Sequence, residues 1–250
     1  MKPLKNKVAL ITGASKGIGK VIALRYAQLG ADVVINYVND SNAADEVVKE
    51  IENYKVRAIS VKADVSKPSE ITRLFEIAMA EFGKIDIVVA NAGLELVGIP
   101  ATAFSEGQFD KLFNTNTKGA FFTMQAAANF VTDNGRIIYI GSSTTGLPNP
   151  GYALHGGSKM AALYLVQVLA KELGRKGITV NAILPTATEG AGIHSIVDEQ
   201  APIRAIIPTF YPMGRMGTPE DVANVAEFFA GELSGFVSGQ QLLVSGGAIA

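Results

Sequence analysis

The stretch VALITGASKGIG, residues 8–19, decides the fold of this chain. Its first five residues, 8–12, form an apolar run that is typical of a buried strand. Residues 17–29 then carry apolar side chains at helical spacing, and Gly30 is the stop expected after a helix. A strand that passes through a glycine-rich turn into a helix is the opening unit of a doubly wound sheet.

The turn between this strand and this helix has the residues of a dinucleotide-binding loop. Its first glycine allows a sharp turn out of the strand, its second lets the backbone approach a phosphate, and its third lets the helix pack on the sheet. A pyrophosphate at the helix N-terminus meets free N–H groups and a favourable helix dipole. The predicted cofactor-binding residues here are Gly13, Ser15, Lys16, Gly17, Ile18 and Gly19. The alternative is a tight turn that binds nothing.

The alternation of strands and helices continues to the end of the chain. Further strands are expected at 31–38, 56–61, 85–90, 135–141, 178–184 and 241–244, and further helices at 41–54, 68–82, 105–130, 153–174 and 219–230. Apolar strands that are each followed by a helix indicate a parallel sheet covered on both faces. Since no Pro-, Gly- or Ser-rich linker divides the chain, we predict one α/β Rossmann-type domain over residues 1–250, with about seven parallel strands.

Residues 186–217 interrupt this alternation, because they carry little regular periodicity. A long stretch of this kind inside a compact domain is usually a lid or a binding loop. We therefore predict a substrate loop or lid at about 186–217. The histidine within it, His194, is expected to be a solvated loop residue and not a catalyst.

The composition of the 250 residues excludes several classes of function. A net charge of -1 provides no electrostatic footprint for nucleic acid or for an anionic membrane. The absence of cysteine excludes disulfides and thiolate chemistry, and two histidines are too few for a multi-histidine metal site. No apolar run is long enough to span a bilayer, and the N-terminal residues carry no signal peptide. We expect a cytoplasmic protein without a metal, a membrane or a nucleic-acid partner.

The end of the second expected strand indicates which dinucleotide binds. NAD-binding sites usually have an acidic residue there, whereas this chain has Asn36. A lysine in the glycine turn and several hydrogen-bond donors nearby suit the 2′-phosphate of NADP. These residues are Lys16, Asn36, Tyr37, Asn39 and Ser41. Asp40 is the one residue that favours NAD, so we predict NADP(H) in preference to NAD(H).

Motifs along the whole chain resemble those of the short-chain dehydrogenase/reductase family. They are, in order, the glycine turn at 12–19, Asp64 and Val65, Asn91, Ala92 and Gly93, Asn116, Ser142 and Ser143, Lys159, Pro185, and the run GRMGTPEDV at 214–222. The resemblance implies an oxidoreductase that interconverts a carbonyl and an alcohol, and it implies a tetramer.

The resemblance also implies roles for these residues. Asp64 and Val65 would hold the adenine, residues 91–93 would line the ribose, and Pro185 and Thr188 would lie along the nicotinamide. In the catalytic centre, Ser142 would hydrogen-bond the substrate oxygen, Lys159 would bind the nicotinamide ribose, and Asn116 would hold a water of a proton relay.

One position departs from the family pattern. The family has a proton-donating tyrosine four residues before the lysine, and that residue here is His155. Residues four apart share a helix face, so His155 and Lys159 should point together. Imidazolium donates a proton near neutral pH, but the lysine cation opposes that form, so we expect an altered site that favours reduction at lower pH. Tyr152 is the alternative acid, although Pro148 and Pro150 favour a loop there.

The expected substrate pocket combines these groups with the segment 186–217. Its predicted substrate contacts are Glu95, Ser142, Thr144 and Tyr152, and the apolar residues of the segment suggest a mostly apolar carbonyl or alcohol. Helices 105–130 and 153–174 are apolar on more than one face, which favours a homotetramer or homodimer.

The leading hypothesis is an NADP(H)-dependent oxidoreductase. The alternatives are a catalytically silent dinucleotide-binding oligomer, and a non-redox lyase or epimerase with Glu95 and His155 as acid and base.

Overall fold

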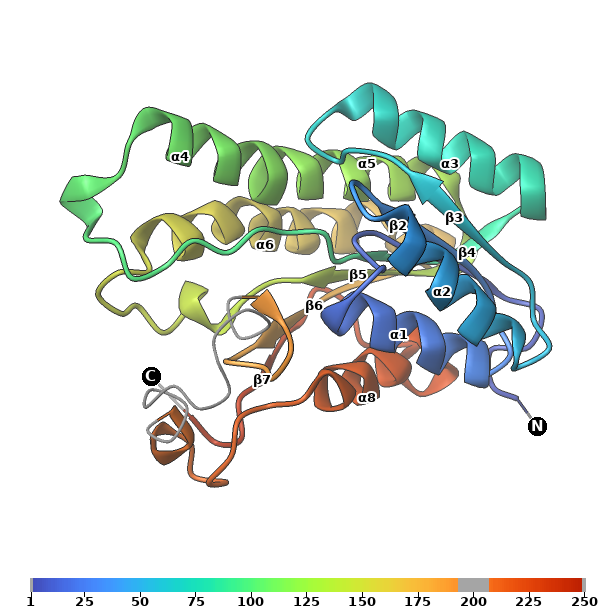
Figure 1. Ribbon diagram of the computed structural model, residues 1–250. Coiled ribbons are helices and arrows are strands. Elements are labelled where there is room, and N and C mark those ends of the chain that lie inside the picture. The colour runs from blue at the N-terminus through green and yellow to red at the C-terminus, as the bar shows by residue number, and fades with distance from the viewer. Residues whose placement is uncertain (1, 193–206, 249–250) are drawn as a thin grey trace.

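The structure, a computed structural model, describes residues 2–192 and 207–248. These residues form one sheet of seven parallel strands in the order β3-β2-β1-β4-β5-β6-β7 (Figure 1). The strands are β1 (Val8–Ile11), β2 (Asp32–Tyr37), β3 (Ala58–Lys62), β4 (Ile85–Ala90), β5 (Val131–Ile140), β6 (Thr179–Pro185) and β7 (Gln241–Val244). The predicted α/β fold with about seven parallel strands is confirmed.

Helices cover both faces of the sheet (Figure 1). One face carries α1 (Gly17–Gln28), α2 (Ser41–Glu52) and α8 (Pro219–Ala230), and the other carries α3 (Pro68–Phe82), α4 (Glu106–Leu112), α5 (Ala120–Phe130) and α6 (Ala153–Leu173). Alternate strand residues point to opposite faces, so Ala9 and Ile11 lie in the α1 core while Leu10 lies in the α6 core. Both cores are apolar, which explains why the strands read as continuous apolar runs.

The strand order reverses between β1 and β4, and this reversal locates the site. The chain runs outward from β1 to β2 and β3, then returns to place β4 on the other side of β1. Ligands of open α/β sheets bind in the crevice outside the carboxyl ends of the strands at such a switch point. The glycine turn follows β1 and residues 91–93 follow β4, so both motifs lie at this crevice.

The expected helix at 105–130 is interrupted. It consists of α4, a π-helical segment at Phe113–Gly119, and α5. An inserted residue in the helical repeat cannot be recognised from apolar periodicity, and π-helical segments are frequent at functional sites. The fifth strand also begins earlier than expected, at Val131, because its pairing with β4 shifts register between Ile85 and Ile87.

The two ends of the predicted lid lie beside each other. Thr188 and Gly217 form a β-bridge, and the Glu189 N–H donates to the Gly217 carbonyl at 2.9 Å. His194 lies outside the described residues, so its expected place on a solvated loop stays a prediction, as does the lid itself. Across residues 2–192 and 207–248, no helix combines the length and apolar character needed to cross a bilayer.

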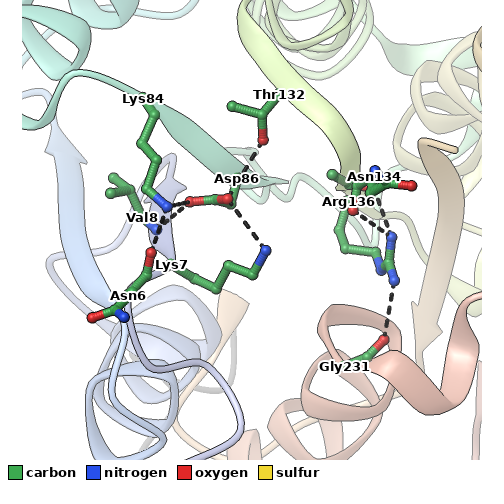
Figure 2. A network of polar contacts seen from close by, with 10 residues as sticks. Asn6, Lys7, Val8, Lys84, Asp86, Thr132, Asn134, Arg136 and Gly231 are labelled. Carbon is green, nitrogen blue, oxygen red and sulfur yellow. Dashed lines mark hydrogen bonds and ion pairs between the residues drawn. The ribbon is translucent and has the colours of Figure 1, made fainter. Parts of the chain in front are cut away.

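Charged residues fasten the sheet where β1, β4 and β5 begin, at the end opposite to their carboxyl ends, and Figure 2 shows these contacts. Asp86, which is buried at the start of β4, accepts a hydrogen bond from the Val8 N–H at 2.8 Å. Its carboxylate also pairs with Lys84 at 3.0 Å and with Lys7 at 3.4 Å. Arg136 of β5 donates to the carbonyl oxygen of Gly231 after α8, at 3.5 Å. At this end of the sheet, ion pairs hold Asp86 and a backbone hydrogen bond holds Arg136.

Candidate functional site

The loops after β1 and β4 touch so closely that they require glycine. Gly13 has a φ of 62°, and a Cβ on it would lie 2.9 Å from the Cα of Ala92. A Cβ on Gly19 would lie 2.5 Å from the Nδ2 of Asn91. That same Nδ2 donates to the carbonyl oxygens of Thr12 at 2.8 Å and Gly13 at 3.0 Å. Asn91 thus fixes the glycine turn on the loop after β4.

The N-terminus of α1 is open. Lys16 precedes the helix with extended backbone, and no side chain among the described residues caps the first turn. The first turn also lacks an acidic residue, and Gly17 has a φ of 57°. The free N–H groups and the helix dipole at this end suit an anion. The turn therefore fits the pyrophosphate of a dinucleotide, with Ser15 in the turn and Ile18 in the first turn of α1.

Asn36 has a structural role that its position in the sequence did not reveal. Its side chain is buried, accepts a hydrogen bond from the Gly13 N–H at 3.1 Å, and donates to the Ala63 carbonyl at 2.8 Å. The amide thus supports the glycine turn and points into the fold, and its predicted contact with a 2′-phosphate stays a prediction.

The other residues predicted to hold a 2′-phosphate differ in their exposure. Lys16, Asn39 and Ser41 are exposed, and Tyr37 is half-buried. Asp40 caps α2, because its carboxylate accepts a hydrogen bond from the Ala43 N–H at 2.9 Å. The one acid near this end is therefore engaged by the helix, while the basic and hydroxyl groups remain open to a ligand.

Asp64 and Val65 lie at the carboxyl end of β3. Asp64 accepts from the Ser66 N–H at 2.9 Å, and its own N–H donates to Glu70 at 2.8 Å. Val65 is buried against Gly119, where a Cβ would lie 3.0 Å from its side chain. This turn lies beyond the carboxyl end of β3, and its role in holding an adenine stays a prediction.

Asn116 fastens the loop after β4 to α6. It is fully buried in the π-helical segment, and its Oδ1 accepts from the Leu94 N–H at 2.7 Å. Its Nδ2 donates to the Leu94 carbonyl and to the Ser158 Oγ, each at 2.9 Å. Both N–H donors of the amide are therefore used within the protein. Sequence reasoning missed this role, and the water relay implied for Asn116 stays a prediction.

His155 and Lys159 lie together on the buried face of α6, with exposed fractions of only 7% and 5%. The Lys159 Nζ donates to the Ile140 carbonyl at 3.1 Å and lies 5.4 Å from the ring centre of Tyr139. A Cβ on Gly93 would lie 2.9 Å from this ammonium nitrogen, so a side chain there would displace the lysine. The arrangement places a cation at the carboxyl ends of β4 and β5.

Ser142 and Tyr152 flank this face. The Ser142 Oγ lies 2.8 Å from the Thr144 Oγ1, in a buried turn after β5. Tyr152 is half-buried and directly precedes α6, which begins at Ala153, so its expected place before the helix is confirmed. A cavity of about 180 Å³ between the 144–152 loop and α6 is lined by Thr144, Tyr152 and Met160, among others.

Burial and charge set the protonation of the two groups on α6. Burial, followed by the charge of Lys159, lowers the pKa of His155, whereas Glu95 and a hydrogen bond with the Leu94 backbone raise it. Burial lowers the pKa of Lys159 to about 8, with Glu95 opposing. His155 is therefore neutral at pH 7 and Lys159 is mostly charged. Within the described residues, the Nδ1 of His155 has no hydrogen-bond partner.

The last two predicted cofactor residues lie where β6 ends. Pro185 is the final residue of β6, and the Thr188 Oγ1 donates to the Thr186 carbonyl at 2.9 Å. Gly192, four residues after Thr188, lies against the side chain of Glu95 on the loop after β4. In the part of the chain that the structure describes, no three His, Cys, Asp or Glu side chains gather to hold a metal ion.

Comparisons with known proteins agree with this geometry. The family model described as enoyl-(acyl carrier protein) reductase matches residues 13–248. Hydroxynaphthalene reductase-like protein Arp2 of Metarhizium brunneum is 39% identical, over 99% of this chain and 97% of its own length. Versicolorin reductase of Emericella nidulans is 38% identical, over 98% of this chain and 96% of its own length.

A solved structure supports the same assignment. The short-chain dehydrogenase from Burkholderia cenocepacia J2315, in complex with NADP, matches with a TM-score of 0.89 and 33% identity, over 99% of this chain and 100% of that chain. Sequence, fold and site geometry all lead to one conclusion. The chain belongs to the short-chain dehydrogenase/reductase family of oxidoreductases.

Proposed function

We propose that the protein is an NADP(H)-dependent oxidoreductase that interconverts a carbonyl and a secondary alcohol, with His155 in the role that tyrosine has in the family. One observation carries the proposal. His155 and Lys159 lie buried side by side on α6, at the edge of the sheet where the open N-terminus of α1 and the loop at 91–93 meet. When bound, the nicotinamide supplies a hydride to the carbonyl carbon or accepts one from the alcohol carbon.

The residues of the crevice fit the cofactor from end to end. The N–H groups of residues 17–19 bind the pyrophosphate, and the turn at Asp64 and Val65 holds the adenine. Lys159 binds the ribose next to the nicotinamide, and Pro185 and Thr188 line the nicotinamide itself. The close backbone approach at Gly13 and Gly19, where an added Cβ would clash with the loop after β4, supports this fit.

A preference for NADP(H) follows from the residues around β2. Lys16 supplies a positive charge, and Tyr37, Asn39 and Ser41 supply donors to the 2′-phosphate. The capping role of Asp40 supports this assignment, because a carboxylate engaged by α2 competes less for a ribose hydroxyl. The Burkholderia structure in complex with NADP is a further support.

His155 moves the proton in the proposed reaction. The imidazolium donates its proton to the substrate oxygen as that oxygen gains negative charge, and it is left as neutral imidazole. Ser142 donates a hydrogen bond to the same oxygen. Burial and the charge of Lys159 hold the pKa of His155 down, so the proton leaves readily but is seldom present at pH 7. Reduction should therefore accelerate as the pH falls.

The test is cofactor oxidation with a panel of ketones, run with NADPH and with NADH between about pH 5 and pH 8. The proposal expects faster NADPH oxidation with at least one ketone, and a rate that increases toward acid. NADPH binding without turnover at any pH would instead identify a silent binding protein. Substrate conversion without net cofactor change would identify a lyase or epimerase that uses Glu95 and His155.

A homotetramer or homodimer is part of the same proposal. Large apolar side chains are exposed along α4, α5 and α6, and Tyr164 of α6 is 72% exposed. The others are Phe109, Phe121 and Met160. Exposed apolar side chains that gather on neighbouring helices support an interface. Light scattering on the protein as it elutes from a size-exclusion column measures its mass. A mass equal to that of one chain would contradict the oligomer.

A further inference from the structure

The loop after β4 is anchored on both sides of Glu95. On one side, Asn116 bonds both the N–H and the carbonyl of Leu94, at 2.7 and 2.9 Å. On the other side, the Gly98 N–H donates to the Gly151 carbonyl at 3.0 Å. The glutamate between these anchors is half-buried. Its position is therefore set by the backbone on either side of it.

The first anchor connects directly to the helix that carries His155. Asn116 donates to the Ser158 Oγ at 2.9 Å, and that hydroxyl donates to the His155 carbonyl at 2.8 Å. Leu94, the residue next to Glu95, is therefore linked to the backbone of His155 through Asn116 and Ser158.

The far side of Glu95 is closed by Gly192. A Cβ at this position would overlap the Oε2 of Glu95, and Gly192 has a φ of 56°. Only glycine gives this backbone conformation without strain and leaves room for the carboxylate. The carboxylate therefore packs against the backbone of the segment after β6.

Two charged groups act on His155 within the described residues, Lys159 from its own helix and Glu95 from the loop after β4. Tyr152, which precedes α6, also faces Glu95, but burial raises its pKa and it stays neutral. The His155 Nδ1 has no partner among the described residues. A protonated imidazole in this position carries one positive charge beside another, and Glu95 supplies the compensating negative charge.

We propose that Glu95 is a positioning residue whose carboxylate holds the protonated, proton-donating form of His155 against the charge of Lys159. This inference rests on the proposed role of His155 in reduction. The carboxylate does not touch the reacting atoms. It changes the fraction of molecules in which His155 carries the proton that the substrate oxygen receives.

The test begins with a measurement that does not require activity. The chain has two histidines, so the protein labelled with ¹⁵N-histidine gives two imidazole titrations, and His194→Gln assigns them. In Glu95→Gln the titration midpoint of His155 should fall by about one pH unit. Glu172→Gln removes the same charge from an exposed site at the far end of α6 and should leave the His155 midpoint unchanged.

Kinetics then separate this inference from the proposed function. In Glu95→Gln the pH at which ketone reduction is half-maximal should fall by the same amount as the His155 midpoint. The KM for NADPH should be unchanged, and Glu95→Asp should restore part of the shift. A shifted His155 midpoint in a protein that reduces no ketone supports the role of Glu95 and overturns the proposed function. An active Glu95→Gln with an unshifted His155 midpoint overturns the role of Glu95 and leaves the function intact. Near-ultraviolet circular dichroism checks that both variants are folded.

Discussion

The two edges of the sheet treat a buried charge in opposite ways. At the amino-terminal edge, Asp86 is paired with two lysines and with a backbone N–H (Figure 2). At the carboxyl-terminal edge, Lys159 is as deeply buried, yet among the described residues it has no carboxylate within ion-pair distance. In the part of the chain that the structure describes, its ammonium donates to the Ile140 carbonyl and lies over the ring of Tyr139.

The difference in pairing indicates different roles for Asp86 and Lys159. A buried charge that is fully paired stabilises the fold or is at least harmless to it, whereas an isolated one costs free energy. A protein retains an isolated cation when a ligand or a reaction uses it. The comparison predicts that removing Lys159 harms activity and spares stability, and that removing Asp86 does the reverse.

The largest expected effect is on activity at the carboxyl-terminal edge. Lys159→Met removes the cation and keeps much of the side-chain volume, so kcat/KM for ketone reduction should fall by at least about 100-fold. The free energy of unfolding should stay equal or rise, because a buried unpaired charge is lost. Lys171→Met, on the exposed side of the same helix, is the matched control. A stable variant with normal turnover would contradict the contrast between the edges.

The second effect is a dependence of stability on pH. The pKa of Lys159 is about 8 in the folded chain, below the value of about 10.4 in an unfolded chain. Between these values the unfolded chain binds more protons, so its contribution to stability rises with pH, by on the order of 2–3 kcal/mol. Urea unfolding at several alkaline pH values measures this. The rise should be missing in Lys159→Met.

The third effect lies at the amino-terminal edge. Asp86→Asn removes the negative charge that two lysines and the Val8 N–H share, and should lower the free energy of unfolding by about 1–3 kcal/mol. The lysines are partly exposed, so solvent screens much of their attraction, and most of the loss comes from the weaker hydrogen bond that a neutral amide accepts from the Val8 N–H. Turnover of the folded protein should be unchanged. A loss of turnover without loss of stability would reverse the assignment of the two edges.

The fourth effect sharpens the account of the catalytic edge. His155→Tyr supplies a phenol beside Lys159, so the donor no longer depends on a protonated imidazole. Ketone reduction at pH 7 should rise by about tenfold, and the increase toward acid should flatten. His155→Phe is the control without a proton. If the tyrosine variant gains nothing and the native chain is fully active at neutral pH, histidine is a competent donor as it stands.

The smallest effect concerns the tyrosine next to the helix. Tyr152→Phe should change turnover by less than about twofold, because burial and the charge of Glu95 raise the pKa of this phenol and keep its proton in place. Initial rates with the best ketone measure it. A large loss would move the proton-donating role from His155 to Tyr152.

The glycine turn and the strand pattern could be predicted because both depend on local rules. Gly13 and Gly19 are required wherever two loops approach at backbone distance, and apolar strands follow from a sheet buried on both faces. The pairing of His155 with Lys159 followed from helical spacing alone.

Other features could not be predicted, because they depend on which way a side chain turns. The amide of Asn36 points into the fold and that of Asn116 into the loop after β4, although each looked in sequence like a ligand-binding residue. Likewise, nothing in the sequence indicates that Gly192 makes room for Glu95, since the two are separated by almost 100 positions.

The π-helical segment at Phe113–Gly119 has a consequence for how such a site can be lost. A π-helical turn contains one residue more than an α-helical turn, so removing one residue there would restore a regular helix. Successive residues of an α-helix are rotated by about 100° about the helix axis. A deletion before Asn116 would therefore rotate its side chain away from Leu94. The hydrogen bonds between Asn116 and Leu94 therefore depend on the number of residues in this segment as well as on their identity. A one-residue deletion in this segment is a more severe lesion than most substitutions along it.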